Sequence, residues 1–118
     1  MTAPLKRFNT LDEFSFHHTI DAADGVCIVL FTKPSCSSCK HWKVLLQQLL
    51  TKRLDLRVFE VDAELSPALA REFELFHLPA LFVYRGGLFY GALQCEGKLG
   101  VVEHALDDAL QRDPMDPP

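Results

Sequence analysis

The chain contains 118 residues, of which 48% are apolar, 24% are charged and 10% are aromatic. This length predicts a single domain, because typical domains contain about 100–150 residues, and the apolar fraction excludes an intrinsically disordered chain. The formal net charge of −4 offers no basic surface of the kind that nucleic-acid-binding proteins use. We therefore expect no nucleic acid among the partners.

Hydrophobic residues occur in short runs along the whole chain. The longest unbroken runs, such as residues 26–31, contain five or six residues, whereas a membrane-spanning helix needs about 20. Residues 1–19 mix charged residues and histidines with hydrophobic ones and lack the apolar core of a secretory signal. These features predict a cytoplasmic protein with no membrane partner.

The C-terminal end differs in composition from the rest of the chain. Residues 113–118 include three prolines, and chain termini are often poorly ordered unless something ties them down. No linker, repeat or low-complexity segment interrupts the preceding sequence. The predicted organisation is one domain over residues 1–112, followed by a disordered tail over residues 113–118.

The N-terminal third alternates between strand and helix patterns. Residues 5–8 are a candidate short strand, and Thr10 and Glu13 have the spacing of a capping box, which marks the start of a helix. We therefore expect a helix from residue 10 to about residue 22. Residues 26–32 are an apolar run rich in β-branched side chains, typical of a strand buried on both faces.

The middle of the chain predicts two helices and a strand. A loop containing Pro34 precedes a helix over residues 37–52, in which apolar residues recur at helical spacing. Residues 56–62 largely alternate between apolar and polar side chains and predict a strand. Ser66 followed by Pro67 has the pattern of an N-cap and a first helical residue, so a third helix is expected there.

The C-terminal third predicts a hairpin and a helix. Residues 80–84 and 88–94 are strands joined by a tight turn at Gly86-Gly87, and residues 98–111 place apolar side chains on one helical face. The resulting order is β-α-β-α-β-α-β-β-α. Because strand–helix–strand crossovers join parallel strands, the sequence predicts an α/β fold with a parallel core and one antiparallel hairpin.

Two of the four cysteines form a C-x-x-C pair, Cys36-Ser37-Ser38-Cys39. The pair lies between a predicted buried strand and a predicted helix, which in a cytosolic protein indicates a thioredoxin-like redox motif. This spacing at a helix start brings two sulfurs within bonding distance. The positive end of the helix dipole favours the thiolate of Cys36, so Cys36 is the candidate nucleophile and Cys39 the thiol that resolves the mixed disulfide.

Two other interpretations of the pair remain open. A C-x-x-C pair can be half of a zinc site, which His41 or His77 would complete. Zinc usually takes four ligands, and the sequence contains no second C-x-x-C and no H-x-x-x-H, so we expect no metal. The pair could also be a structural remnant without redox activity.

Two segments resemble the thioredoxin family. Residues 31–40, with the sequence FTKPSCSSCK, resemble its active-site segment, and residues 78–84, LPALFVY followed by Gly86-Gly87, resemble the segment that carries its cis-proline. The similarity covers roughly residues 5–111. It implies a thioredoxin fold, with a central mixed sheet of about five strands flanked by about four helices, and it implies that Leu78 and a cis-Pro79 shape a groove for an extended substrate.

The resemblance also implies a function. Members of the family are thiol–disulfide oxidoreductases that act on protein disulfides. Such a protein needs no cofactor, because the two sulfurs carry the electrons, but it needs a reductase or another thiol as its electron donor. A glutathione-linked, glutaredoxin-like reductase and a non-catalytic binding module built on the same groove are the alternatives.

The chain departs from the family pattern near the cysteines. Ser35 replaces the usual tryptophan, and Ser-Ser replaces Gly-Pro between the cysteines. Leu30 stands where thioredoxins carry a buried acid that takes the second cysteine's proton, and Val58 is expected in place of its lysine partner. Deprotonation of Cys39 must therefore use water or another base.

Several other residues have both a functional and an ordinary interpretation. Cys95, at the position of a glycine that flanks the family's groove, is either a third redox or regulatory thiol or a small buried side chain. His77 lies two residues before Pro79 and is a candidate substrate contact. Glu60 or Asp62 could stand in for the missing acid; otherwise they are solvated charges.

The remaining cysteine and most aromatic residues are predicted to fill the core. These residues are Cys27, Trp42, Phe73, Phe76, Phe82 and Phe89.

Overall fold

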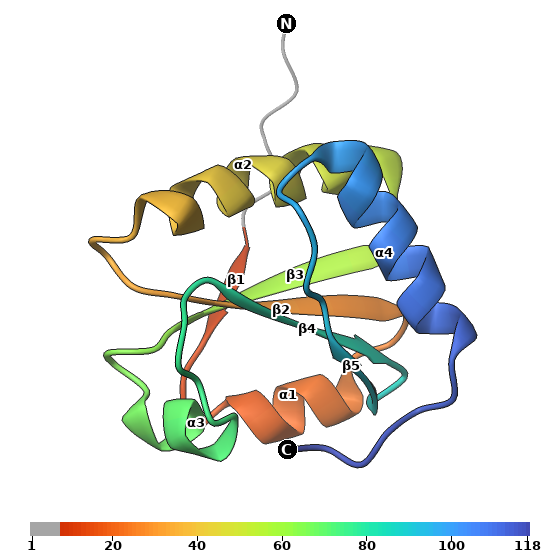
Figure 1. Cartoon of the computed structure of the whole chain (residues 1–118). Helices are drawn as coiled ribbons and strands as arrows, with labels where there is room; N and C mark the ends of the chain where they lie inside the picture. The colour runs from red at the N-terminus through yellow and green to blue at the C-terminus, as the bar shows by residue number, and fades with distance from the viewer. Residues whose placement is uncertain (1–7) are drawn as a thin grey trace, which may run out of the picture.

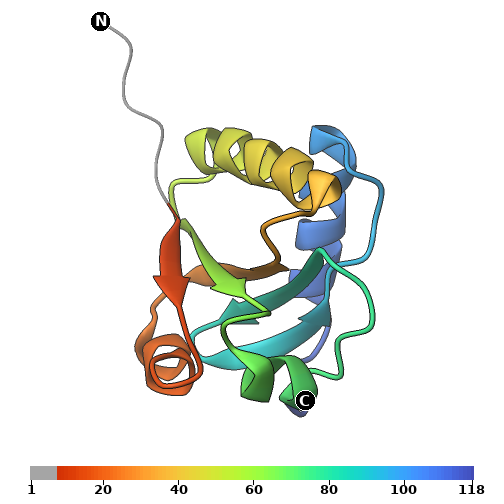
Figure 2. The ribbon, with the colours of Figure 1, turned by 90° about the vertical axis from the view of Figure 1, so that its left-hand side faces the viewer.

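A computed structural model describes residues 8–118 as a five-stranded mixed sheet covered by helices on both faces (Figures 1 and 2). The strand order is β1-β3-β2-β4-β5; β1 and β2 run parallel to β3, whereas β4 runs antiparallel to β2 and β5. The elements are β1 Asn9–Leu11, α1 Phe16–Ala22, β2 Val26–Thr32, α2 Ser37–Lys52, β3 Leu56–Asp62, α3 Pro67–Glu72, β4 Ala80–Arg85, β5 Leu88–Ala92 and α4 Leu99–Gln111.

The element order confirms the predicted β-α-β-α-β-α-β-β-α arrangement. Helices α2 and α4 cover the upper face of the sheet in Figure 1, and α1 and α3 cover the lower face. The predicted bounds of β2, α2 and β3 are confirmed to the residue, and α4 begins one residue later than expected. Gly86 and Gly87 make the hairpin turn with φ of 59° and 81°, values that few residues other than glycine adopt.

Strand β2 is the centre of the molecule, and all seven of its residues are buried. Successive side chains of a strand point to opposite faces of the sheet, so β2 contributes to two cores. Ile28 and Leu30 pack in the core under α2 and α4, whereas Val29 and Phe31 pack in the core against α1 and α3. A strand that is apolar at every position therefore fixes the sheet between two helical layers.

The core against α1 and α3 is aromatic. Phe31, Phe73 and Phe82 lie with ring centroids 4.8–5.7 Å apart, a distance range at which aromatic pairs attract beyond their buried area. Trp42 is also buried, as predicted, on the other side of the sheet. The prediction is wrong for Phe76, whose side chain is 89% exposed.

The predicted start of the first helix is wrong. Thr10 lies in β1, where its parallel partner on β3 is Glu60, and α1 begins only at Phe16. Glu13 does not cap α1; its Oε2 accepts a hydrogen bond of 3.0 Å from the backbone N–H of Ala68 at the start of α3. Pairing with the sheet therefore overrides the local capping pattern. The strand predicted at residues 5–8 lies largely outside the described residues, and Phe8 is not in a strand.

A reciprocal hydrogen-bond pair does precede α1, two residues later than predicted. The Asp12 carboxylate accepts from the backbone N–H and the hydroxyl of Ser15, and the Ser15 hydroxyl accepts from the backbone N–H of Asp12. The hydrogen bond from the Ser15 hydroxyl is the largest of the effects that hold the pKa of Asp12 below its ordinary value.

The C-terminal residues lie along the edge of the sheet. The backbone N–H of Met115 donates a hydrogen bond of 2.7 Å to the carbonyl of Phe89 in β5. The disorder expected for residues 113–118 stays a prediction. Within residues 8–118, no helix is both long enough and apolar enough to cross a bilayer.

We predict that Asp12→Ala lowers the melting temperature by a few degrees at pH 7. Because the pKa of this carboxyl is lowered by folding, its stabilising contribution is present above the unfolded-state pKa and is lost as the pH falls through the folded-state value. The difference from the wild type should therefore shrink below pH ~4. Melting followed by circular dichroism between pH 7 and pH 2 checks this. Asp116→Ala, in the exposed tail, is the control, and an equal effect of both substitutions would contradict the prediction.

Candidate functional site

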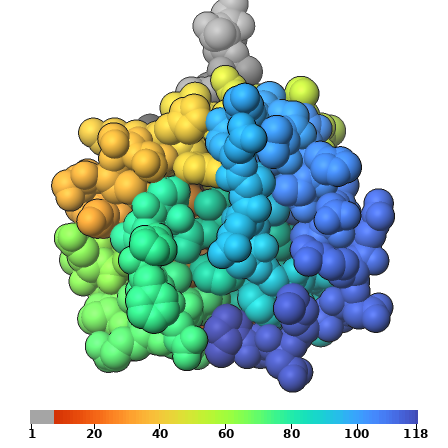
Figure 3. Space-filling model, viewed as in Figure 1, coloured from red at the N-terminus to blue at the C-terminus, as the bar shows by residue number. Residues whose placement is uncertain are grey.

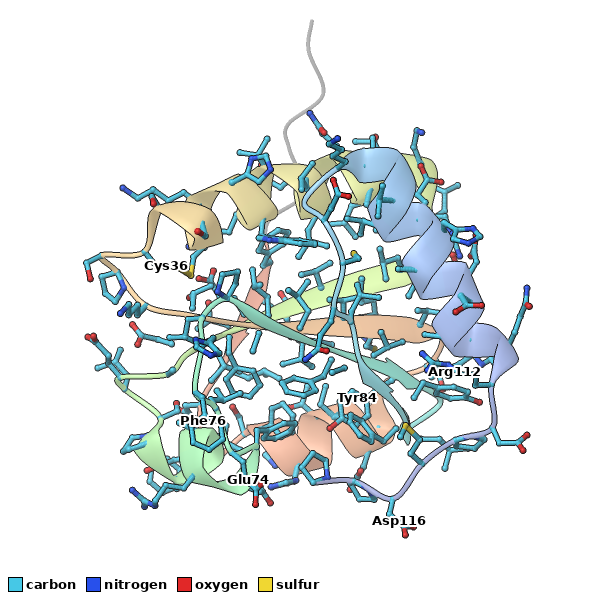
Figure 4. All side chains as sticks on the ribbon, in the orientation of Figure 1. Cys36, Glu74, Phe76, Tyr84, Arg112 and Asp116 are labelled. Carbon is cyan, nitrogen blue, oxygen red and sulfur yellow. A yellow bond between two sulfur atoms is a disulfide. The ribbon has the colours of Figure 1, made fainter. Side chains whose placement is uncertain are left out.

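The C-x-x-C pair lies at the N-terminus of α2, just after the C-terminal end of the central strand β2 (Figure 4). Cys36 is the N-cap residue, and Cys36 and Cys39 are joined by a disulfide with their Cα atoms 5.2 Å apart. The Sγ of Cys36 accepts a hydrogen bond of 3.1 Å from the backbone N–H of Cys39. The sulfur thus occupies the place of the oxygen that usually caps a helix.

The two cysteines differ in exposure. Cys36 is 8% exposed and Cys39 is 1% exposed. The outer sulfur is therefore the one that a second molecule can reach first, and the inner sulfur lies under the first turn of α2. This difference agrees with Cys36 as the nucleophile and Cys39 as the resolving thiol.

The loop before β4 comes directly to the disulfide. The Leu78–Pro79 peptide bond is cis, as the sequence analysis expects, and the carbonyl oxygen of Leu78 lies 3.8 Å from the Sγ of Cys36. Leu78 and Pro79 are both partly exposed. A carbonyl and a proline ring therefore border the redox pair at the surface.

An open groove of about 570 Å³ begins beside this loop. In Figure 3, the segments that border the groove are the start of α2 (orange), residues 74–80 (green to teal) and residues 92–95 (light blue). Figure 4 shows Phe76 on the outer side of the residue 74–80 segment. Most of the lining is apolar; it comprises Ser38, Trp42, Phe73, Glu74, Leu75, Phe76, His77, Pro79, Ala80, Leu81, Phe82, Ala92, Leu93, Gln94 and Cys95.

Charged side chains lie on another side of the disulfide. Lys33 and Lys40 are exposed near the cysteines, and Lys43 Nζ forms an ion pair of 2.7 Å with Glu60 Oε2. These residues line a second cleft together with Cys36 and Cys39. The redox pair therefore has an apolar groove and a charged cleft beside it.

The accessory candidates lie in the apolar groove and not in the charged cleft that the two cysteines line. Cys95 and His77 both line the apolar groove. His41, named as a zinc ligand in one alternative, forms a hydrogen bond of 2.8 Å with the carbonyl of Gly97. Within the part of the chain that the structure describes, no group of three or more potential metal ligands comes together.

A family model for thioredoxin matches residues 7–108. The chain belongs to the thioredoxin family. Curated thioredoxins of Mycobacterium bovis and Mycobacterium tuberculosis are each 28% identical to it over 74 residues, which is 62% of this chain and 64% of the relative. The match therefore spans less than two thirds of the length of these relatives.

Solved structures of the thioredoxin family confirm the predicted fold. Mitochondrial thioredoxin 3 of Saccharomyces cerevisiae, in its oxidised form, superposes with a TM-score of 0.74 at 22% identity, covering 86% of this chain and 94% of that one. Thioredoxin of Trypanosoma brucei brucei superposes with a TM-score of 0.75 at 18% identity, covering 95% and 98%.

The register between β2 and β3 places a carboxylate beside Leu30. Leu30 lies opposite Glu60 and Ile28 lies opposite Val58, so Val58 is a diagonal neighbour of Leu30, and both side chains pack in the core under α2 and α4. The third-strand residue beside the fully buried Leu30 is thus a carboxylate. A strand register is set by long-range pairing, and counting along one strand does not reveal it.

The positions of Phe76 and Lys43 were not predicted from the sequence. Phe76 looks like core because it is aromatic, but it lies in the loop before Pro79, where its side chain has no layer to pack under. Lys43 follows Cys39 by four residues, and residues four apart lie on the same face of a helix. That spacing could have placed Lys43 beside the inner cysteine.

We predict that Cys95 reacts slowly with iodoacetamide at pH 7. Burial and, to a smaller extent, Glu96 raise the pKa of this thiol, so less of it is thiolate at neutral pH. In the oxidised protein Cys36 and Cys39 are protected, and Cys27 is fully buried with a raised pKa. Mass spectrometry of the alkylated protein then reports on Cys95.

The Glu96→Gln variant should react faster than the wild type, by less than about threefold, because only the smaller of the two causes is removed. Glu103→Gln, on α4, is the control. A Glu96→Gln rate equal to or below that of the control would contradict the assignment of Glu96 as a cause.

Proposed function

We propose that the chain is a thiol–disulfide oxidoreductase that acts on protein disulfides through the Cys36–Cys39 couple. The observation that carries this proposal is the disulfide at the N-terminus of α2, with its outer sulfur beside the Leu78–Pro79 loop that borders an apolar groove. The reaction needs no resident cofactor, because two electrons pass between two sulfur pairs.

In the reduced protein, Cys36 is the nucleophile. The backbone N–H of Cys39 and the positive end of the α2 dipole favour its thiolate form. The thiolate attacks one sulfur of a substrate disulfide, which breaks the substrate S–S bond, forms a mixed disulfide and releases one substrate thiolate that takes a proton from water. Cys39 then attacks the Sγ of Cys36, closes the intramolecular disulfide and releases the second substrate thiol.

The loop before β4 positions the substrate in this mechanism. The Leu78 carbonyl lies within 3.8 Å of the attacking sulfur, so the main chain of an extended segment beside Leu78 and Pro79 would hold its own sulfur close to Cys36. His77 and Cys95 line the neighbouring groove and are candidate accessory contacts. Leu78 and Pro79 are thus the proposed substrate-binding residues.

The reaction cycle also needs a second partner. After each turnover the Cys36–Cys39 disulfide must be reduced by a reductase or by another thiol that serves as the electron donor. We place this cycle in the cytoplasm, where cellular reductants keep thiols reduced. We propose no nucleic-acid or membrane partner.

We predict that Cys39→Ser traps substrates as stable mixed disulfides on Cys36, because nothing then resolves the intermediate. Incubation of the reduced variant with insulin, followed by non-reducing electrophoresis and mass spectrometry, should show a dithiothreitol-sensitive adduct. The variant should also lose turnover in an insulin-reduction assay by at least about 100-fold.

The matched control is Cys36→Ser, which retains the inner thiol and should form no adduct. Adducts of equal yield on both variants, or none on either, would contradict the assigned roles. A non-catalytic binding module would capture insulin in the wild type without turnover. A glutaredoxin-like enzyme would turn over only when glutathione is the reductant.

A further inference from the structure

The charged cleft beside the disulfide has a volume of about 260 Å³ and brings a carboxylate into the same space as both cysteines. It is formed by the end of β2, the first turns of α2 and the end of β3. Its lining comprises Thr32, Lys33, Pro34, Cys36, Cys39, Lys40, Lys43, Glu60 and Asp62.

Glu60 is held in this cleft from two sides. Its Oε2 accepts a hydrogen bond of 2.7 Å from the hydroxyl of Thr32 and forms an ion pair of 2.7 Å with Nζ of Lys43. Thr32 is the last residue of β2, and Lys43 lies one helical turn after Cys39 on α2. The Glu60 side chain is 20% exposed, so it is screened from bulk water but not sealed from it.

The inner cysteine needs a proton acceptor. Cys39 can attack only as a thiolate, and burial disfavours that charged form. Its side chain is 1% exposed, so bulk water reaches it poorly. A base inside the cleft would remove this obstacle.

Among the cleft residues, Glu60 fits that role better than Asp62. The Oδ1 of Asp62 already accepts from the backbone N–H groups of Glu64 and Leu65, where it shapes the turn after β3. The second oxygen of Glu60, Oε1, accepts no hydrogen bond from any of residues 8–118. That oxygen is free to receive a proton.

We propose that the Glu60 carboxylate accepts the proton of Cys39 through water in the cleft, and that Lys43 and Thr32 are positioning residues for it. This inference rests on the proposed function. A cleft of this size with several polar groups can hold such a water.

The proton transfer accompanies the resolution of the mixed disulfide between Cys36 and a substrate thiol. The Cys39 S–H proton passes to Glu60, the Cys39 thiolate forms a bond to Cys36 Sγ, and the bond between Cys36 Sγ and the substrate sulfur breaks. The departing thiolate takes up a proton, and Glu60 returns its proton to the cleft water. The protein loses two electrons and the substrate gains them.

The test follows the two halves of the reaction separately with the aromatic disulfide DTNB. The reduced protein releases one coloured thiolate when Cys36 attacks and a second when Cys39 resolves. Stopped-flow absorbance resolves the two phases. All proteins carry Cys95→Ser to remove a competing thiol, and Cys39→Ser in the same background identifies the first phase by releasing one equivalent.

Glu60→Gln should slow the second phase by at least about tenfold at pH 7 and leave the first phase within about twofold of the parent. The defect should narrow as the pH rises above ~9, because hydroxide then ionises the thiol without a base. The charged groups that face the cleft, Lys33, Lys40, Lys43 and Asp62, are unchanged, so the altered pH profile reports on Glu60.

The matched control is Glu103→Gln, which removes a carboxylate that pairs with Lys52 at 2.9 Å far from the cysteines. It should leave both phases unchanged. The proposal would be overturned if the second phase of Glu60→Gln were as fast as that of the control. It would also be overturned if the second phase were slowed by the same factor at every pH, because a structural effect would not depend on pH.

A second variant covers the case in which Glu60→Gln misfolds. Glu60→Ala leaves space in the cleft, and added formate should restore the second phase, whereas chloride at the same ionic strength should not. Absence of rescue would contradict the role of Glu60. If the parent protein itself releases no second equivalent, the proposed function fails, which distinguishes that failure from a failure of Glu60 alone.

Discussion

The sulfur of Cys36 caps α2 by accepting the backbone N–H of Cys39, and this single contact links the fold to the chemistry. The contact requires β2 to end at Thr32 and α2 to begin a few residues later, at Ser37. The double burial of β2 provides this, because a strand enclosed by two cores has little freedom to shift. The reactive sulfur is thus held by the most deeply buried part of the protein.

The second constraint is the register between β2 and β3. It brings Glu60 opposite the buried Leu30, on the face of the sheet that α2 covers. A carboxylate at that position would be unfavourable without partners, and Lys43 and Thr32 supply them. The charged cleft therefore follows from the pairing of two strands with one helix, and its residues come from three separate segments of the sequence.

Much of the fold could be predicted because its strongest signals are local. The run at β2, the helical spacing in α2 and the glycine pair of the hairpin each specify one kind of element. The start of the first helix could not be placed, because Thr10 and Glu13 fit the capping-box pattern although Thr10 pairs with β3 in the sheet. The redox pair and the cis-proline could be predicted from two short motifs.

The rest of the site could not be read from the sequence for a physical reason. The exposure of a side chain depends on which other elements cover it. Phe76 is aromatic like the core residues, but it lies at the surface. Glu60 was considered as a substitute for the missing acid, but its ion pair with Lys43 depends on the strand register and on the rotation of α2 together. Such contacts between distant segments appear only once the chain is folded.

The most direct measurement is a redox equilibration of the protein across a series of thiol and disulfide buffers, with free thiols trapped by acid and counted by mass spectrometry after alkylation. Cys36 and Cys39 should gain and lose their thiols together, reversibly and with the slope of a two-electron couple, while Cys27 keeps its thiol throughout. If Cys36 and Cys39 remained thiols in every buffer, or oxidised independently of each other, the central claim would be contradicted.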